Sequence, residues 1–365
     1  MKFSINKEEF LAKIILSSRF TSSKLSSSTS LQGVFLKKEK DKIHFYSTNL
    51  NLYYHGFMKL VEKGDFITVI EPKKISEFLS LLPQGNVEVD VREKSIVLIQ
   101  GKTKGEFPVF SSSDFPILKE SKSEKQKIST DFFKNILPLI SFSASTDETR
   151  PVLTGVNFVS ADGSTQLVTT DGFRLSLYSF KENISISSVI VPTSFLIEVG
   201  RLIGGEKEVV FNIDNEEKIL TFFLKEDELS TRLIEGEYPP YEKVIPSERK
   251  TTILVDKDEF LRNIKIVSVF ARDLSNIVVL DTDDNGIKIS PKAGNNEENT
   301  TYQDAKIEGE KQKIAFNYRF LVDLLSSIPA KKVIIELLRS DAPAVFKGEK
   351  DGSFLHIIMP VRVQE

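Results

Sequence analysis

Residues 3–11 read FSINKEEFL, and residues 253–261 read ILVDKDEFL. Each stretch predicts a short apolar strand, a helix cap at Asn6 or Asp256, and charged residues that open an amphipathic helix. A looser copy, KISTDFFKNIL, begins at Lys127. One strand-to-helix unit therefore recurs along the chain. An internal repeat indicates that the chain is built from similar structural units, so the remaining elements are predicted with the repeat in view.

A second strand-to-helix unit follows each copy roughly sixty residues later. Its three versions are VIEPKKISEFLSLL (69–82), VIVPTSFLIEVGRLI (189–203) and IAFNYRFLVDLLSSI (314–328). Equivalent positions Pro72, Pro192 and Asn317 lie 120 and 125 residues apart, and apolar residues recur at helical spacing after each of them. Between the helices, segments such as VEVDV (87–91) and EVVFNI (208–213) have the alternation of strands.

This pattern predicts an α+β fold of three repeated domains, each with two helices backed by a sheet of short strands. The expected domains are residues 1–122, 126–247 and 248–365, with boundaries near the charged stretches SKSEKQK (121–127) and SERKTT (247–252). A chain of 365 residues is too long for one ordinary core, which agrees with several domains.

The composition narrows the class of protein. Hydrophobic residues make up 40% of the chain and charged residues 28%, as in soluble globular domains, and no apolar run is long enough to span a membrane. The N-terminal MKFSINKEEF lacks the pattern of a signal peptide, and the absence of cysteine agrees with a reducing cytoplasm. A net charge of −3 excludes strong attraction of the whole protein to nucleic acid but allows a local basic surface.

Several short strings identify a resemblance that covers essentially the whole chain. They are SDFPIL (113–118), TTDGFRLSL (169–177), VIVP (189–192), STRLIEGEYPPYEKVIP (230–246), FNYRFLVDLL (316–325) and IIMPVRV (357–363). In this order and spacing they resemble the bacterial DNA sliding clamps, the beta subunits of DNA polymerase III. The resemblance implies the DNA clamp fold, in which two three-domain protomers close head to tail into a ring with helices lining the hole and sheets outside.

The resemblance also implies the function. A clamp is a DNA polymerase processivity factor and not an enzyme: it encircles double-stranded DNA without sequence specificity. Its partners are the replicative polymerase, the clamp loader and other proteins that carry a clamp-binding peptide motif, beginning with Gln and ending in Leu or Phe. The resemblance implies a homodimer in the cytoplasm, no membrane, no metal and no cofactor.

Charge supports a DNA-facing role for the helices. Six helix-containing segments, residues 1–25, 70–82, 127–145, 192–203, 256–275 and 314–332, carry a summed formal charge of +6, so the rest of the chain carries −9. Basic helices on an acidic body fit a ring around phosphates. The candidate phosphate contacts are Lys13, Arg19, Lys24, Lys73, Lys74, Lys134, Arg201, Lys265, Arg319, Lys331 and Lys332.

Enzyme motifs are absent from the sequence. It has no glycine-rich phosphate loop, and its three histidines lack ligand spacing. DTDDNG (281–286) begins like a calcium loop, but Lys292 stands where the bidentate acid belongs, so we interpret it as a hairpin turn. Asp171, in TTDGFR, is interpreted as a turn residue because no partner base is evident.

The family binds partner peptides in a groove formed by its second and third domains and the C-terminal segment. The matching positions here are Leu153, Thr170, Gly172, Phe173, Arg174, Leu175, Pro239, Lys243, Val244, Pro343, Met359, Pro360, Val361 and Arg362. We expect the apolar end of the peptide to insert between Leu153, Leu175, Val244 and Val361, with Arg174 and Met359 shaping the walls.

The sequence departs from the family in several places. Phe173 stands where His is usual, and Lys243 where Arg is frequent. The serine-rich stretch SSKLSSSTSLQG (22–33) replaces a proline-containing loop that touches DNA in relatives, and its composition predicts a flexible segment. Pro138 predicts a short or kinked first helix in the second domain.

The dimer contact is expected between the first domain of one chain and the third domain of the other. By resemblance, Phe107 and Val109 on an edge strand would face Val269 and Phe270 near the end of a helix. Two alternatives remain open from sequence: a structural repeat or scaffold protein without a role on DNA, and an enzyme with an unrecognised pair of acids.

Overall fold

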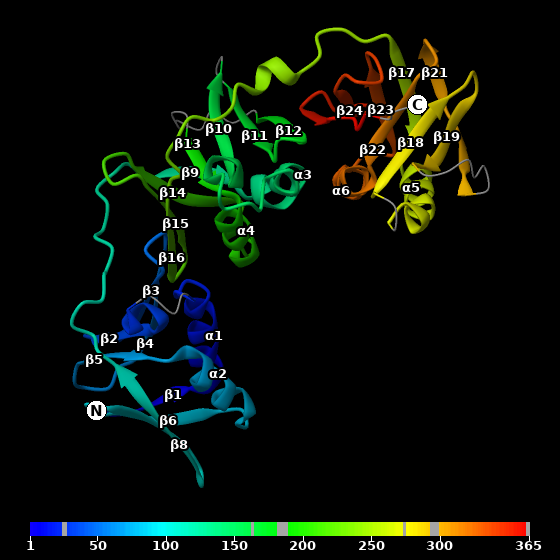
Figure 1. The fold of residues 1–365 in the computed structure, drawn as a ribbon. Coiled ribbons are helices and arrows are strands. Elements are labelled where there is room, and N and C mark those ends of the chain that lie inside the picture. Colours follow the sequence, from blue (N-terminus) through cyan, green and yellow to red (C-terminus); the bar gives the residue numbers. More distant parts are fainter. Residues whose placement is uncertain (24–27, 162–163, 181–188, 273–274, 293–298, 363–365) are drawn as a thin grey trace. The chain divides into compact units, whose positions relative to one another are not determined.

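The computed structural model describes residues 1–23, 28–161, 164–180, 189–272, 275–292 and 299–362 (Figure 1). The chain divides into two compact units: unit 1 comprises Met1–Ile128 and Arg201–Leu233, and unit 2 comprises Ser129–Gly200 and Ile234–Glu365. Among the described residues, no helix is long and apolar enough to cross a membrane.

Unit 1 is built on a twelve-stranded sheet in the order β1-β6-β7-β8-β5-β2-β3-β4-β16-β15-β14-β9. Its strands are β1 (Lys2–Asn6), β2 (Val34–Glu39), β3 (Lys42–Thr48), β4 (Leu52–Lys59), β5 (Phe66–Ile70), β6 (Asn86–Val91), β7 (Ser95–Gln100), β8 (Thr103–Phe110), β14 (Glu208–Asp214), β15 (Ile219–Leu224) and β16 (Asp227–Arg232), with β9 (Gln126–Ser129) at the edge and partly in unit 2. Helices α1 (Lys7–Ser18) and α2 (Pro72–Leu81) pack on each other, and α1 also contacts β3 and β4.

Unit 2 contains a nine-stranded sheet, β13-β10-β11-β12-β25-β24-β23-β17-β21, and a four-stranded sheet, β20-β19-β18-β22. The strands are β10 (Gly155–Ala161), β11 (Ser164–Thr170), β12 (Arg174–Phe180), β13 (Val189–Pro192), β17 (Thr251–Asp256), β18 (Ile277–Thr282), β19 (Gly286–Pro291), β20 (Thr301–Asp304), β21 (Lys306–Gly309), β22 (Lys313–Asn317), β23 (Lys332–Leu337), β24 (Ala344–Gly348) and β25 (Phe354–Ile358). Its helices are α3 (Leu137–Ser141), most of α4 (Thr193–Leu202), α5 (Lys257–Ala271) and α6 (Tyr318–Ser327), and α5 packs against α6.

The six predicted strand-to-helix units are all present. Three helices begin at side-chain caps: Asn6 accepts a hydrogen bond from the N–H of Glu9, Asp256 from that of Glu259, and Asn317 from that of Arg319. These caps satisfy N–H groups that the first helical turn leaves without partners. The predicted hairpin turn at residues 281–286 is confirmed, since it joins the paired strands β18 and β19.

The helix that contains Pro138 is short and irregular, as the proline predicts. A π-helical segment, η2 (Phe132–Ile136), leads directly into the five-residue α3, with Pro138 in the first turn of α3. A proline there has no N–H to donate, so the regular helical ladder cannot continue through it. In the serine-rich stretch 22–33, whose predicted flexibility stays a prediction, Thr29–Gln32 forms a 3₁₀ turn with Leu31 buried, and residues 24–27 lie outside the described residues.

The grouping into two units differs from the three domains expected from the repeat. Strand β16 pairs with β4 from Thr231↔Leu52 to Asp227↔Gly56, so β14–β16 continue the sheet of the first repeat. Strand β12 pairs with β25 in the same way, which joins the second repeat to the third within unit 2. The domain boundaries 1–122, 126–247 and 248–365 remain a prediction.

The pairing of β12 with β25 buries a polar network beneath the sheet. The Nδ1 atom of His356 lies 2.8 Å from the hydroxyl of Ser176, which also accepts a hydrogen bond from Ser143. His356 is completely buried, and its Nε2 atom has no hydrogen-bond partner. Burial, reinforced by the Arg174 guanidinium, lowers the pKa of His356 to about 3. The imidazole is therefore neutral in the folded protein near neutral pH.

This burial predicts a dependence of stability on pH. The folded pKa of His356 lies below the unfolded value of 6.5, so its stabilising contribution is complete above pH 6.5 and is lost as pH falls toward 3. Relative to a His356→Gln variant, the wild type should lose about 2 kcal/mol of unfolding free energy between pH 7.5 and pH 5. Denaturant unfolding of both proteins across this range measures the difference; parallel pH profiles would contradict the prediction.

Candidate peptide-binding groove

The tight turn between β11 and β12 supplies several residues that line the groove. The Thr170 hydroxyl donates to the carbonyl of Arg174 at 2.6 Å and accepts from the N–H of Gly172. Asp171 Oδ1 accepts from the N–H groups of Phe173 and Arg174, which confirms the turn interpretation of Asp171. Gly172 has a φ of +93°, a conformation that glycine adopts without strain.

Arg174 forms one wall of the groove and is held from several sides. Its guanidinium pairs with Asp171 at 3.0 Å and with Asp323 of α6 at 2.6 Å. The same group lies over the ring of Phe320 at 4.5 Å and over that of Phe142 at 5.5 Å. These contacts leave its side chain 11% exposed and fix the orientation of the wall.

The segment after β16 supplies another part of the wall. Residues Tyr241–Val244 form a 3₁₀ turn, η4, in which Tyr241 is buried. The Tyr241 hydroxyl donates to the side chain of Gln166 at 3.0 Å, and burial raises the pKa of Tyr241 to about 12. The hydroxyl of Tyr238 donates to the Val168 carbonyl, so both tyrosines attach this segment to the sheet.

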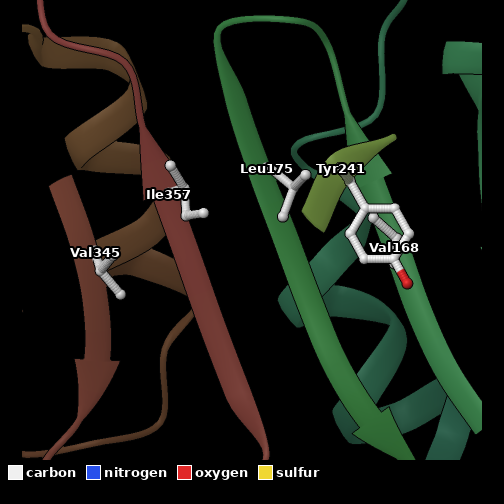
Figure 2. Close-up of a cluster of buried hydrophobic side chains, with 5 residues drawn as sticks. All are labelled: Val168, Leu175, Tyr241, Val345 and Ile357. Carbon is white, nitrogen blue, oxygen red and sulfur yellow. The ribbon is translucent and has the colours of Figure 1, made fainter. Parts of the chain in front are cut away.

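Buried apolar side chains from adjacent strands form the floor (Figure 2). Leu175 of β12 lies opposite Ile357 of β25, and Ile357 lies opposite Val345 of β24. Together with Val168 and Tyr241 they make one buried cluster. Above it lies a cavity of about 220 Å³, whose lining is mostly apolar with one arginine at its side. Such a cavity suits the apolar side chains of a short peptide.

Most of the predicted groove residues come together here. The cavity is lined by Leu153, Thr170, Gly172, Phe173, Arg174, Leu175, Pro239, Val244 and Met359, together with Pro240, Tyr241 and Ile357. Phe173 stands at the mouth, with 60% of its surface exposed, and Met359 and Val244 are 38% and 39% exposed. The prediction missed the last three residues; Ile357 could have been found from the strand alternation of FLHII, which places it on the same face of the sheet as Leu355 and on the opposite face from the buried His356.

Five predicted residues do not line this cavity: Lys243, Pro343, Pro360, Val361 and Arg362. The N–H of Val361 donates to the carbonyl of Ala315 in β22 at 2.8 Å, and the Arg362 carbonyl accepts from Lys292. Val361 and Arg362 are therefore hydrogen-bonded to the third repeat, whereas Ile357 and Tyr241, which were not predicted, line the cavity. Lys243 is exposed on η4.

The predicted DNA-facing residues have different surroundings. Lys73, Lys74, Lys134, Arg201, Lys265 and Arg319 are exposed on helices, and Arg19 is exposed just after α1. Lys13 is instead half-buried, with its ammonium 2.7 Å from Asp227, so its charge is compensated. Lys331 and Lys332 lie beyond α6, which ends at Ser327, and Lys24 lies outside the described residues.

The helical residues carry less positive charge than the sequence segments suggested. The six helices, with η2, hold ten basic and seven acidic residues, a net charge of +3. The sign agrees with the prediction, but the value is half of the +6 of the longer segments. Seven basic and four acidic residues of those segments fall outside the helices, a net loss of three positive charges; the basic ones are Lys2, Arg19, Lys24, Lys127, Arg272, Lys331 and Lys332, and the acidic ones are Glu71, Asp131, Asp256 and Asp273.

The residues predicted for the dimer contact lie at two accessible places. Val269 and Phe270 are in the last turn of α5, where they are 57% and 41% exposed. Phe107 and Val109 are half-buried on β8, and Phe107 packs edge-on against Phe78. Residues 103–108 of β8 pair only with β7 among the described strands, so this part of β8 is an edge.

Three family models match the chain in consecutive order. The N-terminal domain of the DNA polymerase III beta subunit matches residues 1–119, its central domain residues 127–240, and its C-terminal domain residues 242–362. These spans cover nearly the whole chain.

Relatives and solved structures agree over the full length. The beta sliding clamp of Bacillus subtilis is 28% identical, with 99% of this chain and all of the relative covered, and that of Halalkalibacterium halodurans is 27% identical with the same coverage. The crystal structure of the Bacillus subtilis DNA polymerase sliding clamp is 26% identical and superposes with a TM-score of 0.89, covering both chains completely. The DNA polymerase III beta subunit of Thermotoga maritima, 23% identical, has the same fold, with a TM-score of 0.90 and complete coverage of both chains. With all three of its domains present in order on a three-domain clamp fold, this chain belongs to the DNA polymerase III beta subunit family.

Proposed function

We propose that this protein is a DNA sliding clamp, a processivity factor that encircles duplex DNA and tethers the replicative polymerase to it. The observation that carries the proposal is the match of all three beta-subunit domains, in order, over nearly the whole chain. The role is mechanical and needs no catalytic residue. The proposed location is the cytoplasm, where bacterial DNA is replicated.

DNA is proposed to pass along the helices and to contact them through its phosphates only. The exposed basic residues Lys73, Lys134, Lys265 and Arg319 supply such contacts, and the net charge of the helical residues has the sign that phosphates attract. Contacts to phosphates carry no sequence information, which is what a protein that moves along DNA requires.

Retention on circular DNA tests the clamp itself. Protein loaded on a nicked circle by a clamp loader should remain bound and should be released when the circle is cut, because a closed ring can leave only over an end. A variant with four basic residues replaced by glutamate should be loaded less efficiently, since the phosphates then face negative charge. The four replaced residues are Lys73, Lys134, Lys265 and Arg319. Gel filtration of the DNA before and after cutting measures retention. Equal retention on linear DNA, or a strong preference for one sequence, would argue against the clamp.

The groove is proposed to hold the peptide motif of the polymerase, the clamp loader and other partners. An apolar peptide end would contact Leu153 and Val244 on the walls and Leu175 and Ile357 on the floor. Arg174, fixed by Asp171 and Asp323, would orient the peptide backbone or a polar side chain near the entrance. Most of the binding energy should come from the apolar end, because this part is removed from water.

A charge placed in the groove should weaken peptide binding. A fluorescent peptide that begins with Gln and ends in Leu or Phe should bind the wild type with micromolar affinity, about −8 kcal/mol. Val244→Asp puts a carboxylate in the apolar cavity and should weaken binding at least roughly tenfold. Val61→Asp makes the same change at a valine that is 69% exposed and lies outside the cavity, and it should have no effect. Fluorescence anisotropy measures both; equal affinities would place the peptide on another surface.

Two copies of the chain are proposed to close the ring through β8 of one and α5 of the other. The exposed Val269 and Phe270 give this contact an apolar centre, and the edge of β8 gives it unpaired backbone groups. Val269→Arg combined with Phe270→Arg should produce monomers, because two charges would be buried without partners. Val61→Arg is the control and should remain dimeric. Light scattering at micromolar concentration measures the mass; a monomeric wild type would exclude the ring.

A further inference from the structure

Unit 1 contains a second cavity at a place equivalent to the groove. The turn before β4 repeats the turn before β12: the Thr48 hydroxyl donates to the Leu52 carbonyl at 2.7 Å, as Thr170 does to Arg174 at 2.6 Å. Leu50 has a φ of +75° where Gly172 has +93°.

The neighbouring strand and the linker are also equivalent. The N–H of Arg232 donates to the Asn51 carbonyl at 2.8 Å, and that of Met359 donates to the Phe173 carbonyl at the same distance. Beside the first junction runs Phe115-Pro116, and beside the second runs Tyr238-Pro239, each in the segment that links two repeats. The same backbone arrangement, which consists of a turn, an adjacent paired strand and a linker, thus occurs once in each unit; we call it the frame.

The chemistry within the two frames differs. Leu175, Ile357 and Val345 form the apolar floor in unit 2, whereas Tyr53, Ser230 and Thr221 occupy the matching positions on β4, β16 and β15. The unit 1 cavity measures about 270 Å³. Its aromatic walls include Phe223, Phe115 of the linker, and the stacked rings of Tyr46 and His55, whose centroids are 4.5 Å apart.

One residue of this floor lacks any partner. Asn212 of β14 lies opposite Thr221 and lines the cavity. It is 1% exposed, and neither its Nδ2 nor its Oδ1 atom makes a hydrogen bond. By contrast, the hydroxyls of Thr221 and Ser230 bond to each other at 2.8 Å, and that of Tyr53 donates to the Leu50 carbonyl. A buried amide without partners destabilises the fold, so a ligand that satisfied both atoms would bind with that advantage.

We propose that this cavity binds a neutral, planar amide: a group that offers a hydrogen-bond acceptor beside a donor and matches both atoms of Asn212. A carboxylate would satisfy only Nδ2, and an ammonium only Oδ1. The aromatic walls suit a flat group. Glu228 at the wall already accepts from His55 at 3.2 Å and disfavours an anion. The amide could belong to a small molecule or to a glutamine side chain of a partner; the site is independent of the proposed clamp function.

A matched pair of probes tests the site on the full chain. Nicotinamide carries the planar amide, and nicotinate has the same ring with a carboxylate. Nicotinamide should give saturable NMR shifts for residues of the cavity, with millimolar affinity, and nicotinate should bind at least roughly tenfold more weakly. N-acetylglutaminamide is the third probe. If it binds more tightly than nicotinamide, the source of the amide is a partner side chain; the reverse order indicates a small molecule.

Asn212→Leu separates binding from folding. The variant should lose at least roughly tenfold in nicotinamide affinity, while its melting temperature should stay equal or rise, because a buried group without partners is removed. Absence of saturable shifts at this cavity, equal binding of nicotinamide and nicotinate, or unchanged affinity in Asn212→Leu would overturn the proposal. A lower melting temperature for the variant would show that Asn212 has a structural partner and would overturn it as well. The comparison of the two probes on the wild type needs no variant.

Discussion

Strand pairing between successive repeats is the constraint on which the rest of the structure depends. Strand β16 extends the sheet of the first repeat by pairing with β4, and β25 extends the sheet of the second by pairing with β12. A strand edge left unpaired exposes backbone donors and acceptors, so each repeat gains stability from the strand of the next. At both places the linker between repeats contributes to a cavity beside the paired strands.

The local elements could be predicted because their signals are local. The caps Asn6, Asp256 and Asn317 precede apolar residues at helical spacing, and the structure begins helices after each of them. Pro138 similarly predicts the short α3. The turn of TTDGFR was predictable because an Asp side chain can accept from backbone N–H groups of the next residues and Gly adopts a positive φ without strain, and a turn of this kind uses both properties.

Predictions that depend on distant residues were less complete. Lys13 is a basic residue on a helix, but Asp227, far along the chain, compensates its charge. Val361 lies two residues after Met359 in sequence, yet its N–H donates to the carbonyl of Ala315 and its side chain does not line the cavity that Met359 lines. The unit 1 cavity was not predicted, because β4 and β14, with the strands between them, meet only through pairing that local patterns do not encode.

The two equivalent frames show how one backbone can serve different chemistry. The floor of the groove consists of apolar side chains, those of Leu175, Ile357 and Val345. An apolar partner that covers this floor therefore leaves no polar group of the floor without a hydrogen bond. Tyr53, Ser230 and Thr221 at the matching positions make a polar floor, and its hydroxyls are satisfied within the sheet. Asn212 breaks this balance, since it brings two more polar atoms than the sheet can satisfy. An apolar residue there would remove the penalty, so the penalty itself is the reason to look for a ligand at this position.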